Sequence, residues 1–257
     1  MIAAADLRRV ATRDGVRPED VEKEYLQYAF LHSLAADVDG LGFRGGTMLR
    51  IAHGHPRYSE DLDFLRLHSP EEAEASIDAA LADVIHWGIR ARAAAPKVGK
   101  STSIWIVTFR GPLYAASRRE NRIKVEAGST DQLHLPLETS LIPSKYADVP
   151  SFTLPTQDRR ETTAEKVRAL VERDLARDLY DLAHLVDQGL LPKPILVEKK
   201  LGWAAGQRPL PVQPHAKPAY DRDLRDWVPA RAHLPWEAAW AKVRPYLAGL
   251  PSVRLPP

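Results

Sequence analysis

Proline is unevenly distributed along this chain of 257 residues, and its distribution limits where long helices and strands can form. Because proline lacks a backbone N–H group, it interrupts helices and central strands, so regular elements must fit between prolines. Twelve of the 21 prolines follow Leu190, and four more lie between residues 136 and 155. The region after Leu190 therefore has room only for short helices, such as one over residues 235–247.

The part of the chain before residue 136 shows both helical and strand patterns. Apolar residues recur at helical spacing over two segments, 18–36 and 71–88. Strands are expected over three others, 58–67, 103–110 and 122–128, where apolar residues are β-branched or aromatic or alternate with polar ones.

The prolines between 136 and 155 predict a boundary between two lobes, residues 1–150 and 151–257. In the second lobe we expect a helix capped by Thr162 or Thr163 and another over residues 177–187. Four of the six tryptophans follow Leu190, and we expect them to anchor the core of this lobe: Trp203, Trp227, Trp236 and Trp240.

The composition excludes several kinds of chemistry. The chain has no cysteine, which rules out disulfides, thiolate catalysis, iron–sulfur clusters and cysteine-bound zinc. No apolar run approaches the length that crosses a bilayer, and the first residues lack the apolar region of a signal peptide. We therefore expect a cytoplasmic protein without membrane contact, and the net charge of +2 points to no particular partner.

The first candidate site is Gly45-Gly46-Thr47, at a predicted strand-to-helix turn. Two glycines permit backbone conformations closed to other residues, and they let phosphate oxygens approach the amide N–H groups. Thr47 adds a hydroxyl donor. Taken alone, such a turn is also compatible with a purely structural role.

The second candidate site is the pair Asp61 and Asp63. On a strand, residues two apart point to the same face, so both carboxylates project together, with Ser59 on the same face. Two like charges held this close suit a divalent cation between them, and oxygen ligands favour Mg²⁺ or Mn²⁺. The alternative is a solvated polar face of an edge strand.

The third candidate site lies on the predicted strand 122–128, where Lys124 and Glu126 share a face. If this strand is adjacent to the strand of Asp61 and Asp63, Glu126 becomes a third carboxylate. Three acids and two metal ions suit in-line attack on an α-phosphate with pyrophosphate leaving. Arg118, Arg119, Arg122 and Lys124 cluster here, either as a phosphate-binding patch or as a solvated loop.

In this order, the motifs closely resemble the nucleotidyltransferase toxins of the AbiEii/AbiGii type, including the MenT group. The resemblance rests on residues 43–50 (FRGGTMLR) and 57–64 (RYSEDLDF). It extends to three helical segments, residues 21–25, 165–170 and 176–182.

The resemblance implies an α/β (α+β) fold: a polymerase-β-like nucleotidyltransferase lobe with a mixed sheet flanked by helices, joined to a mostly helical C-terminal lobe. It implies the toxin of a bacterial toxin–antitoxin pair that transfers a nucleotide from an NTP to the 3′ acceptor end of tRNA with Mg²⁺ or Mn²⁺. NTP, tRNA and a cognate antitoxin protein are the implied partners.

The resemblance also assigns roles to individual residues. Asp61, Asp63 and Glu126 would hold the metal ions. The triphosphate would be bound by Gly45, Gly46, Thr47, Arg57, Ser59 and Lys124, with Lys124 neutralising phosphate charge.

Lys166 and Asp181 match charged positions of the later helical segments, which the resemblance places at an active-site cleft completed by the C-terminal lobe. The residues alone leave another interpretation open. Arg177 and Asp181 are four apart on a predicted helix and could form a surface ion pair.

Two other functions remain open at this stage. The same residues would suit transfer to a hydroxyl of a small molecule or a protein. A nucleotide-binding module that titrates an antitoxin without turnover is the other alternative, although the presence of all three acids argues against it.

Overall fold

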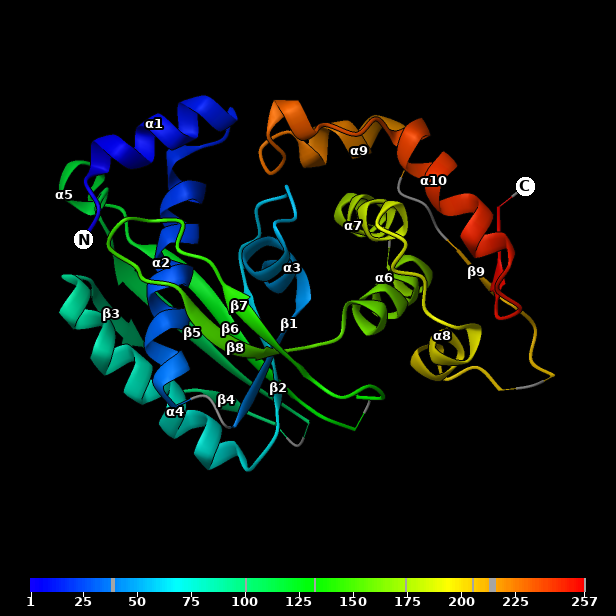
Figure 1. The fold of residues 1–257 in the computed structure, drawn as a ribbon, viewed down its shortest axis with the longest axis horizontal. Coiled ribbons are helices and arrows are strands. Elements are labelled where there is room, and N and C mark those ends of the chain that lie inside the picture. Colours follow the sequence, from blue (N-terminus) through cyan, green and yellow to red (C-terminus); the bar gives the residue numbers. More distant parts are fainter. Residues whose placement is uncertain are drawn as a thin grey trace. The chain divides into compact units, whose positions relative to one another are not determined.

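In a computed structural model, the chain is described over residues 1–37, 40–99, 101–131, 133–173, 175–204, 206–212 and 216–256. It forms two compact units (Figure 1). The first comprises Met1–Leu133 and Leu137–Gln157, and the second comprises His134–Pro136 and Asp158–Pro257. The main division thus falls after Gln157, whereas the prolines suggested residue 150.

The first unit is built on a sheet of eight strands in the order β3-β5-β6-β2-β1-β8-β7, with β4 also paired to β5. The β2–β6 and β1–β8 pairs are parallel and the others are antiparallel, so the expected mixed sheet is confirmed. The strands are β1 Leu41–Arg44, β2 Leu62–Arg66, β3 Arg90–Ala93, β4 Lys97–Val98, β5 Thr102–Arg110, β6 Asn121–Ser129, β7 Glu138–Ile142 and β8 Phe152–Thr156.

Helices cover one face of this sheet (Figure 1). They are α1 Ala4–Asp14, α2 Pro18–Leu34, α3 Gly45–His53, α4 Pro70–Asp83 and the short α5 Tyr114–Ser117, with 3₁₀ turns at Ala35–Asp37 and Val84–Trp87. Trp105, Val107 and Phe109 of β5 are buried, and Phe109 packs edge-to-face on Phe30 of α2. The alternate residues of β5 and β6 face the other way and are more exposed, which leaves that face open to ligands.

The strand predicted over 58–67 is shorter than expected. It begins only at Leu62, because its pairing with β1 ends at Arg44↔Asp63 and its pairing with β6 begins at Leu62↔Val125. The expectation that Ser59, Asp61 and Asp63 share a strand face is therefore wrong, since Ser59 and Asp61 precede the strand and only Asp63 lies on it.

Two strands of the sheet, β7 and β8, were not predicted, because prolines interrupt their sequence pattern. Pro155 lies inside β8, but β8 pairs with β1 only at Phe43↔Thr156. The missing N–H group of Pro155 therefore interrupts no continuous ladder on that side.

The second unit is mostly helical. Its elements are α6 Arg159–Glu172, α7 Ala176–Asp187, α8 Pro194–Leu201, α9 Lys217–Leu224, the 3₁₀ turn Ala230–Ala232 and α10 Trp236–Ala248, with a two-stranded pair of β9 Leu210–Pro211 and β10 Val253–Arg254. Buried aliphatic residues of α6, α7 and α10 form its core: Val167, Leu170, Leu179, Leu182, Val243 and Leu247.

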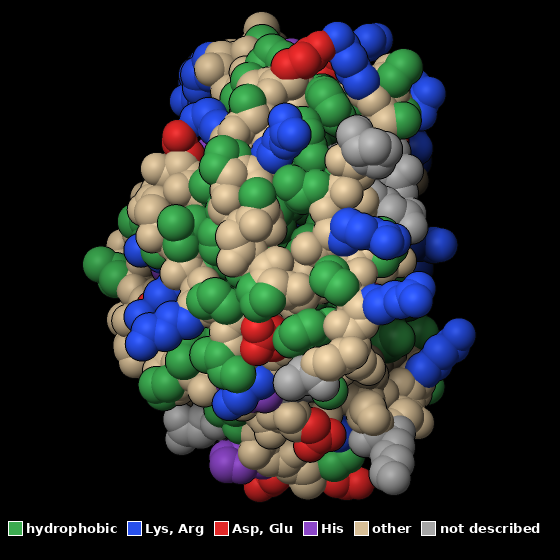
Figure 2. Space-filling model, turned by 90° about the vertical axis from the view of Figure 1, so that its right-hand side faces the viewer, with side chains coloured by type: hydrophobic (Ala, Val, Ile, Leu, Met, Phe, Trp, Pro, Cys, Tyr) green, Lys and Arg blue, Asp and Glu red, His purple; other side chains and the backbone are tan. Residues whose placement is uncertain are grey.

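The four tryptophans of the second unit are half-buried. The expectation that they anchor its core holds for Trp236 and Trp240, which pack against the core, but not for Trp203 and Trp227. Trp236 and Trp240 stack with ring centroids 6.2 Å apart and lie against the edge of the core. Figure 2 shows the side of the molecule that carries α8 and α10, where hydrophobic side chains are scattered among Lys and Arg side chains.

No helix in the described part of the chain combines the length and the apolar character that a bilayer crossing requires.

Helix α6 is capped by Asp158 rather than by Thr162 or Thr163. Oδ1 of Asp158 accepts a hydrogen bond from the Arg160 backbone N–H at 2.7 Å. The two threonines lie inside the helix and donate to the carbonyls of Asp158 and Arg159.

We predict that Asp158→Ala lowers the free energy of unfolding by about 1 kcal/mol, the usual value of an N-cap. Hydrogen bonds from Arg160 lower the pKa of Asp158, so this contribution is complete at neutral pH and is lost as the pH falls through the lowered pKa. Urea denaturation followed by circular dichroism measures the difference. A larger loss for Thr163→Val than for Asp158→Ala would contradict the assignment.

Candidate active site

Two carboxylates meet because β2 and β6 are adjacent parallel strands. In their register Asp63 is the partner of Glu126, so both side chains leave the sheet side by side on its open face. Asp61 directly precedes β2, and its side chain is 39% exposed. The adjacency of the two strands, on which the three-acid hypothesis depended, is confirmed.

Lys124 lies between the acids. Its Nζ atom is 3.1 Å from Oε2 of Glu126 and 3.6 Å from Oδ2 of Asp61. Burial lowers the pKa of Lys124, but the hydrogen bond to Glu126 and the charge of Asp61 outweigh it, and the net pKa is raised. Lys124 is therefore a protonated cation inside a group of carboxylates.

The negative charge of Asp63 is unfavourable in the fold. Its pKa is raised, mainly by burial, with further contributions from the negative charges of Glu126 and Asp61. Arg44, at the end of β1, and Lys124 oppose this shift. A carboxylate destabilised in this way gains from an added cation.

This donor set suits a divalent metal ion. Three carboxylates supply only oxygen ligands, which Mg²⁺ and Mn²⁺ prefer. Lys124 now pairs with two of them, so a metal ion would have to displace its ammonium group from Asp61 and Glu126. In the described residues no three His, Asp or Glu side chains stand in a ready coordination arrangement, so the ligands would have to close around an ion.

The glycine turn lies directly against these acids. Gly45 has a φ of +80°, and a Cβ atom there would be 2.5 Å from Oδ2 of Asp63. At Gly46, a Cβ atom would be 2.7 Å from Nη2 of Arg57 and 3.1 Å from Oγ of Ser59. Gly45 therefore requires glycine, whereas at Gly46 the end of the Arg57 side chain could move aside. The two positions bring Arg57, Ser59 and Asp63 to the same turn.

Gly45 and Gly46 are also the first residues of α3, where backbone N–H groups have no partner within the helix. The side chain of the N-cap residue Arg44 makes no capping hydrogen bond at this end. A helix N-terminus with close backbone access, beside a guanidinium and a hydroxyl, suits phosphate oxygens.

Thr47 was expected to donate its hydroxyl to phosphate, but in the structure the hydroxyl points into the protein. It is fully buried, and its hydroxyl donates a hydrogen bond to the Asp61 carbonyl. Thr47 therefore holds the backbone of a metal-binding candidate instead of presenting a donor to solvent.

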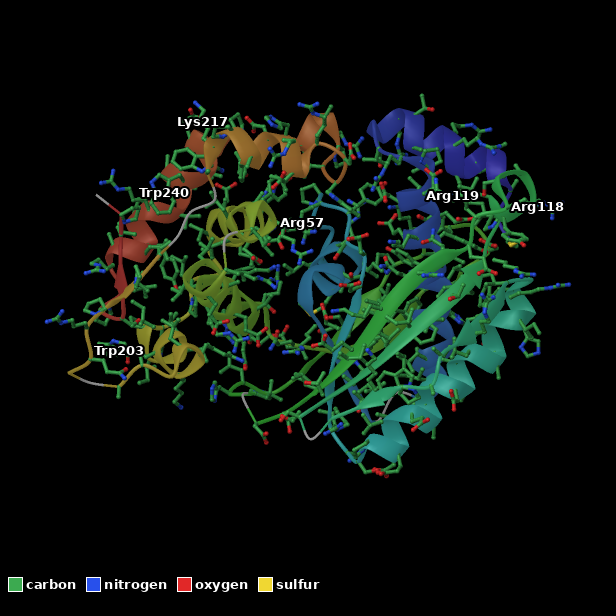
Figure 3. The ribbon with its side chains drawn as sticks, turned by 180° about the vertical axis from the view of Figure 1, so that it is seen from behind. Arg57, Arg118, Arg119, Trp203, Lys217 and Trp240 are labelled. Atoms are coloured by element: carbon green, nitrogen blue, oxygen red, sulfur yellow. The ribbon has the colours of Figure 1, made fainter. Side chains whose placement is uncertain are left out.

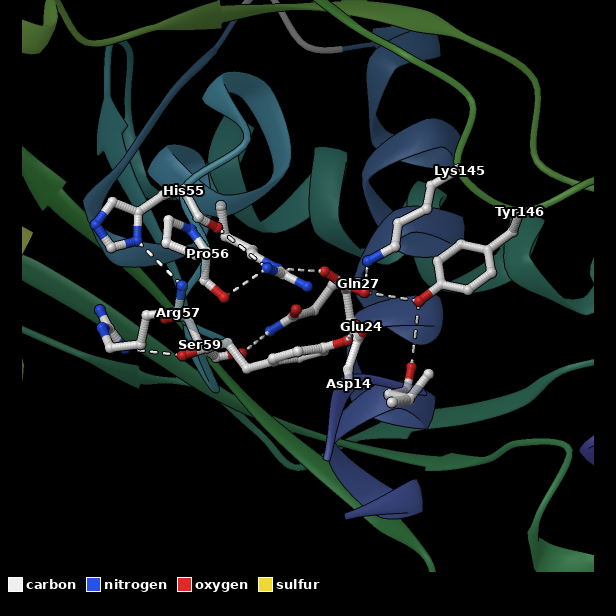
Figure 4. Close-up of polar contacts among 12 residues, drawn as sticks. Asp14, Glu24, Gln27, His55, Pro56, Arg57, Ser59, Lys145 and Tyr146 are labelled. Atoms are coloured by element: carbon white, nitrogen blue, oxygen red, sulfur yellow. Dashed lines mark hydrogen bonds and ion pairs between the residues drawn. The ribbon is translucent and has the colours of Figure 1, made fainter. Parts of the chain in front are cut away.

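The segment 54–61, between α3 and β2, is held by side chains rather than by strand pairing (Figure 4). Nε2 of Gln27 donates to the carbonyls of Ser59 and Glu60, both at 3.0 Å. Nη1 of Arg50 donates to the carbonyls of His55 and Pro56 at 3.1 and 2.7 Å. His55 accepts from the Arg57 N–H through Nδ1, so it belongs to this turn.

Arg50 is itself held by Glu24, a buried residue of α2 (Figure 4). Oε1 of Glu24 is 2.6 Å from Nε of Arg50, while Oε2 pairs with Lys145 and accepts from the Tyr146 hydroxyl at 2.8 Å. Burial would raise the pKa of Glu24, but the charges of Lys145 and Arg50 outweigh it and lower the pKa. Glu24 is therefore a buried anion.

Figure 3 shows that the basic residues singled out in the sequence separate in space. Arg57 lies near α3, whereas Arg118 and Arg119 lie at the far end of the sheet near α5. Arg119 and Arg122 line a pocket of about 440 Å³ in which five acidic residues outnumber four basic ones; the acids are Glu19, Asp20, Glu22, Glu60 and Glu120. This pocket is not a polyanion site.

In the second unit, Lys166 and Asp181 pair with each other. Nζ of Lys166 is 2.8 Å from Oδ2 of Asp181 and 3.1 Å from Oδ1 of Asp178, and both carboxylates are fully buried. The alternative of a surface ion pair between Arg177 and Asp181 is wrong, because α7 turns Asp181 inward while Arg177 is exposed.

Several residues of these sites were not found from the sequence: Arg44, Gln27, Glu24, Arg50 and Asp178. For two of them, Glu24 and Gln27, the sequence carried a signal that could have been used. Glu24 and Gln27 are polar residues on the apolar stretch of a helix that turns out to be buried, a position that calls for a partner.

Comparison with known proteins agrees with the motifs. Residues 29–245 match the family described as "Nucleotidyl transferase AbiEii toxin, Type IV TA system". The chain belongs to the AbiEii nucleotidyltransferase toxin family. It is therefore a nucleotidyltransferase of the type IV toxin–antitoxin kind, a family that uses NTP with a divalent metal and implies an antitoxin partner.

Solved structures show the same fold. JHP933 from Helicobacter pylori is 18% identical with a TM-score of 0.58, over 90% of this chain and 93% of that one. MenT4, a nucleotidyltransferase toxin from Mycobacterium tuberculosis, is 22% identical with a TM-score of 0.54, over 97% and 99%. No curated protein matches the sequence.

We predict that Gly45→Ala abolishes nucleotidyl transfer and destabilises the first unit by about 1–3 kcal/mol. The substitution forces a side chain into a positive φ and against Asp63. Gly54→Ala is the matched control, because Gly54 also has a positive φ (+66°) but no atom within 4 Å of an added Cβ. Equal loss of activity in both variants would show that backbone strain, not contact with Asp63, is responsible.

We predict that Lys166→Met destabilises the second unit by about 3–5 kcal/mol, because it removes the cation shared by two buried carboxylates. Arg173 still pairs with Asp178 in the variant, so the loss falls mainly on Asp181. Lys242→Met serves as control, since Lys242 pairs with Asp187 at the surface, where such pairs contribute about 1 kcal/mol or less. Thermal unfolding compares the two. Similar stabilities would contradict a structural role for the buried pair.

Proposed function

We propose that this protein transfers a nucleoside monophosphate from an NTP to the 3′ acceptor end of tRNA in a Mg²⁺-dependent reaction that releases pyrophosphate and blocks translation. The observation that carries the proposal is the meeting of Asp63, Glu126 and the Gly45-Gly46 turn on one face of the sheet. Acids for metal and a backbone site for phosphate lie in contact there.

In this proposal Asp61, Asp63 and Glu126 hold the metal ions. Bound metal lowers the pKa of the attacking hydroxyl and stabilises charge on the transferred phosphate. The chain's own residues place the NTP: the N–H groups at the start of α3, with Arg57 and Ser59 beside Gly46, bind triphosphate oxygens. Lys124, held between the acids, neutralises negative charge at the reacting centre.

Thr47 and Gln27 orient the site without touching the substrate. Through the carbonyls of Asp61 and Ser59 they fix the two residues that must face the metal and the triphosphate. Rigid placement of this kind lowers the cost of bringing the reacting groups together.

The tRNA acceptor is supported by the resemblance to the MenT group, which includes the segments around Lys166 and Asp181. We propose a role in the reaction for both residues on the same ground, beside their role in the core. A cognate antitoxin that binds this toxin belongs to the same proposal and is supported by the family.

We predict that Asp63→Asn reduces label transfer from α-labelled NTP to total tRNA by at least about 100-fold, or ~2.7 kcal/mol in the barrier. Because burial raises the pKa of Asp63, its charge is unfavourable in the fold, and the neutral amide should not lower stability. Loss of activity with an unchanged melting temperature therefore identifies a direct role.

Asp78→Asn, an exposed residue of α4, is the matched control and should transfer as the wild type does. Pyrophosphate release by the wild type with a small-molecule or protein acceptor, but no labelled tRNA, would refute the tRNA acceptor and retain the chemistry. No transfer and no pyrophosphate with any acceptor would refute the reaction.

A further inference from the structure

The positive charge of this protein is concentrated in one part of the second unit. That unit carries 17 Lys and Arg residues against 13 Asp and Glu, whereas the first unit, which holds the candidate metal-binding acids, carries 19 against 21. Within the second unit, residues 188–212 and 238–256 contain seven Lys and Arg but one acid, Glu198. The rest of the chain is net negative, so long-range attraction for a polyanion comes from these two segments.

Strand pairing and hydrogen bonds join the two segments into one surface. β9 pairs with β10, the strand of Arg254. Nε1 of Trp203, just after α8, donates to the Arg208 carbonyl at 3.4 Å, and the Tyr246 hydroxyl of α10 donates to the Pro192 carbonyl at 3.3 Å. Figure 2 looks onto this side of the molecule, where Lys and Arg side chains are more numerous than Asp and Glu side chains.

Most cations of this surface are not neutralised by the protein itself. Lys200 is buried on Glu161 and Glu165, and Lys242 pairs with Asp187. The other five are exposed, and in the described part of the chain their side chains form no ion pair. These five residues define the basic surface: Lys193, Lys199, Arg208, Arg244 and Arg254.

The backbone that carries these cations is ordered. Lys193 stands between two prolines, and Arg208 and Arg244 each directly precede one. Proline fixes its own φ and restricts the residue before it. Lys199 and Arg254 lie in α8 and β10. Because all five cations are presented from fixed backbone, less conformational entropy is lost when a ligand binds them.

The chemistry of the basic surface favours a phosphodiester backbone over a protein. Lys is depleted at protein–protein interfaces, whose centres are apolar. The large apolar side chains exposed in the described parts of these segments are Leu191 and Ile195, far less than a stable protein interface buries. Lys and Arg bind phosphate oxygens along a nucleic acid without needing an apolar centre.

We propose that the basic surface binds internal phosphates of an RNA acceptor. Each contact replaces condensed counterions on the RNA by a Lys or Arg side chain, so binding is independent of sequence and weakens as salt is added. The surface thereby retains the acceptor on a protein whose first unit is net negative. This inference rests on the proposed function, because it takes RNA as the acceptor.

Fluorescence anisotropy of an RNA hairpin with a stem of about 12 base pairs, a 5′ fluorophore and a 3′-terminal phosphate tests the surface without the reacting hydroxyl. The double variants Lys193→Gln/Lys199→Gln and Arg208→Gln/Arg254→Gln should each raise the Kd at least about tenfold. Each should also lower the slope of log Kd against log salt concentration by about 2, since two phosphate contacts are lost.

Arg8→Gln/Arg90→Gln is the matched control and should keep the Kd within about twofold. It removes the same charge from two exposed cations of the first unit that, in the described structure, also form no ion pair. Since all six residues are exposed, thermal unfolding should be unchanged in the three double variants.

Steady-state labelling of tRNA provides the second readout. The two double variants of the basic surface should raise the KM for tRNA by the factor found for the hairpin, with kcat and the Kd of Mg·NTP unchanged. If the wild type labels tRNA and these variants keep its KM, the basic surface is refuted and the proposed function stands. If the hairpin depends on the surface but no tRNA is labelled, the surface stands and the tRNA proposal fails.

Three binding results would also overturn the basic surface. The first is a wild type that does not bind the hairpin, and the second is hairpin binding by both double variants with the affinity of the control. The third is competition by poly-L-glutamate of equal charge as strong as that by unlabelled hairpin, which would assign the surface to an acidic protein instead of RNA.

Discussion

The buried carboxylate of Glu24 is the constraint on which the active-site half of the first unit depends. An unpaired charge inside a protein is strongly destabilising, so Glu24 requires the cations of Arg50 and Lys145 in fixed positions. Nη1 of Arg50 does not bind Glu24 and instead donates hydrogen bonds to the carbonyls of His55 and Pro56. A charge in the core thus determines the path of a loop at the surface.

This loop could not otherwise have a defined shape. It precedes β2, so strand pairing does not satisfy its carbonyls, and side chains of α2 and α3 do so instead. The three residues that face the proposed substrate, Arg57, Ser59 and Asp61, all belong to it. A loop backbone fixed in this way lowers the cost of bringing these side chains to a bound ion and NTP.

The second unit also contains buried charges that are held by ion pairs. Lys200 is almost fully buried between Glu161 and Glu165, and Glu161 also accepts the backbone N–H groups of His134 and Leu135. Together with Lys166, this places two buried lysines on carboxylates of α6 and α7. Removing one partner of a buried ion pair is strongly destabilising, because the other charge is left buried without compensation.

The sequence by itself determined the parts of this protein that depend on neighbouring residues. Alternation on a strand and the special backbone of glycine are local properties, so the acids of residues 63 and 126 and the turn at residue 45 could be identified before any fold was known. Asp61 was identified by its spacing from Asp63, although it lies just before the strand. The tertiary structure decided what requires contact between distant residues: the register of Asp63 with Glu126, the inward turn of the Thr47 hydroxyl, and the pairing of Lys166 with Asp178 and Asp181. A buried polar group needs a partner, but the sequence does not say which one. Only the packing of helices and strands brings the two together.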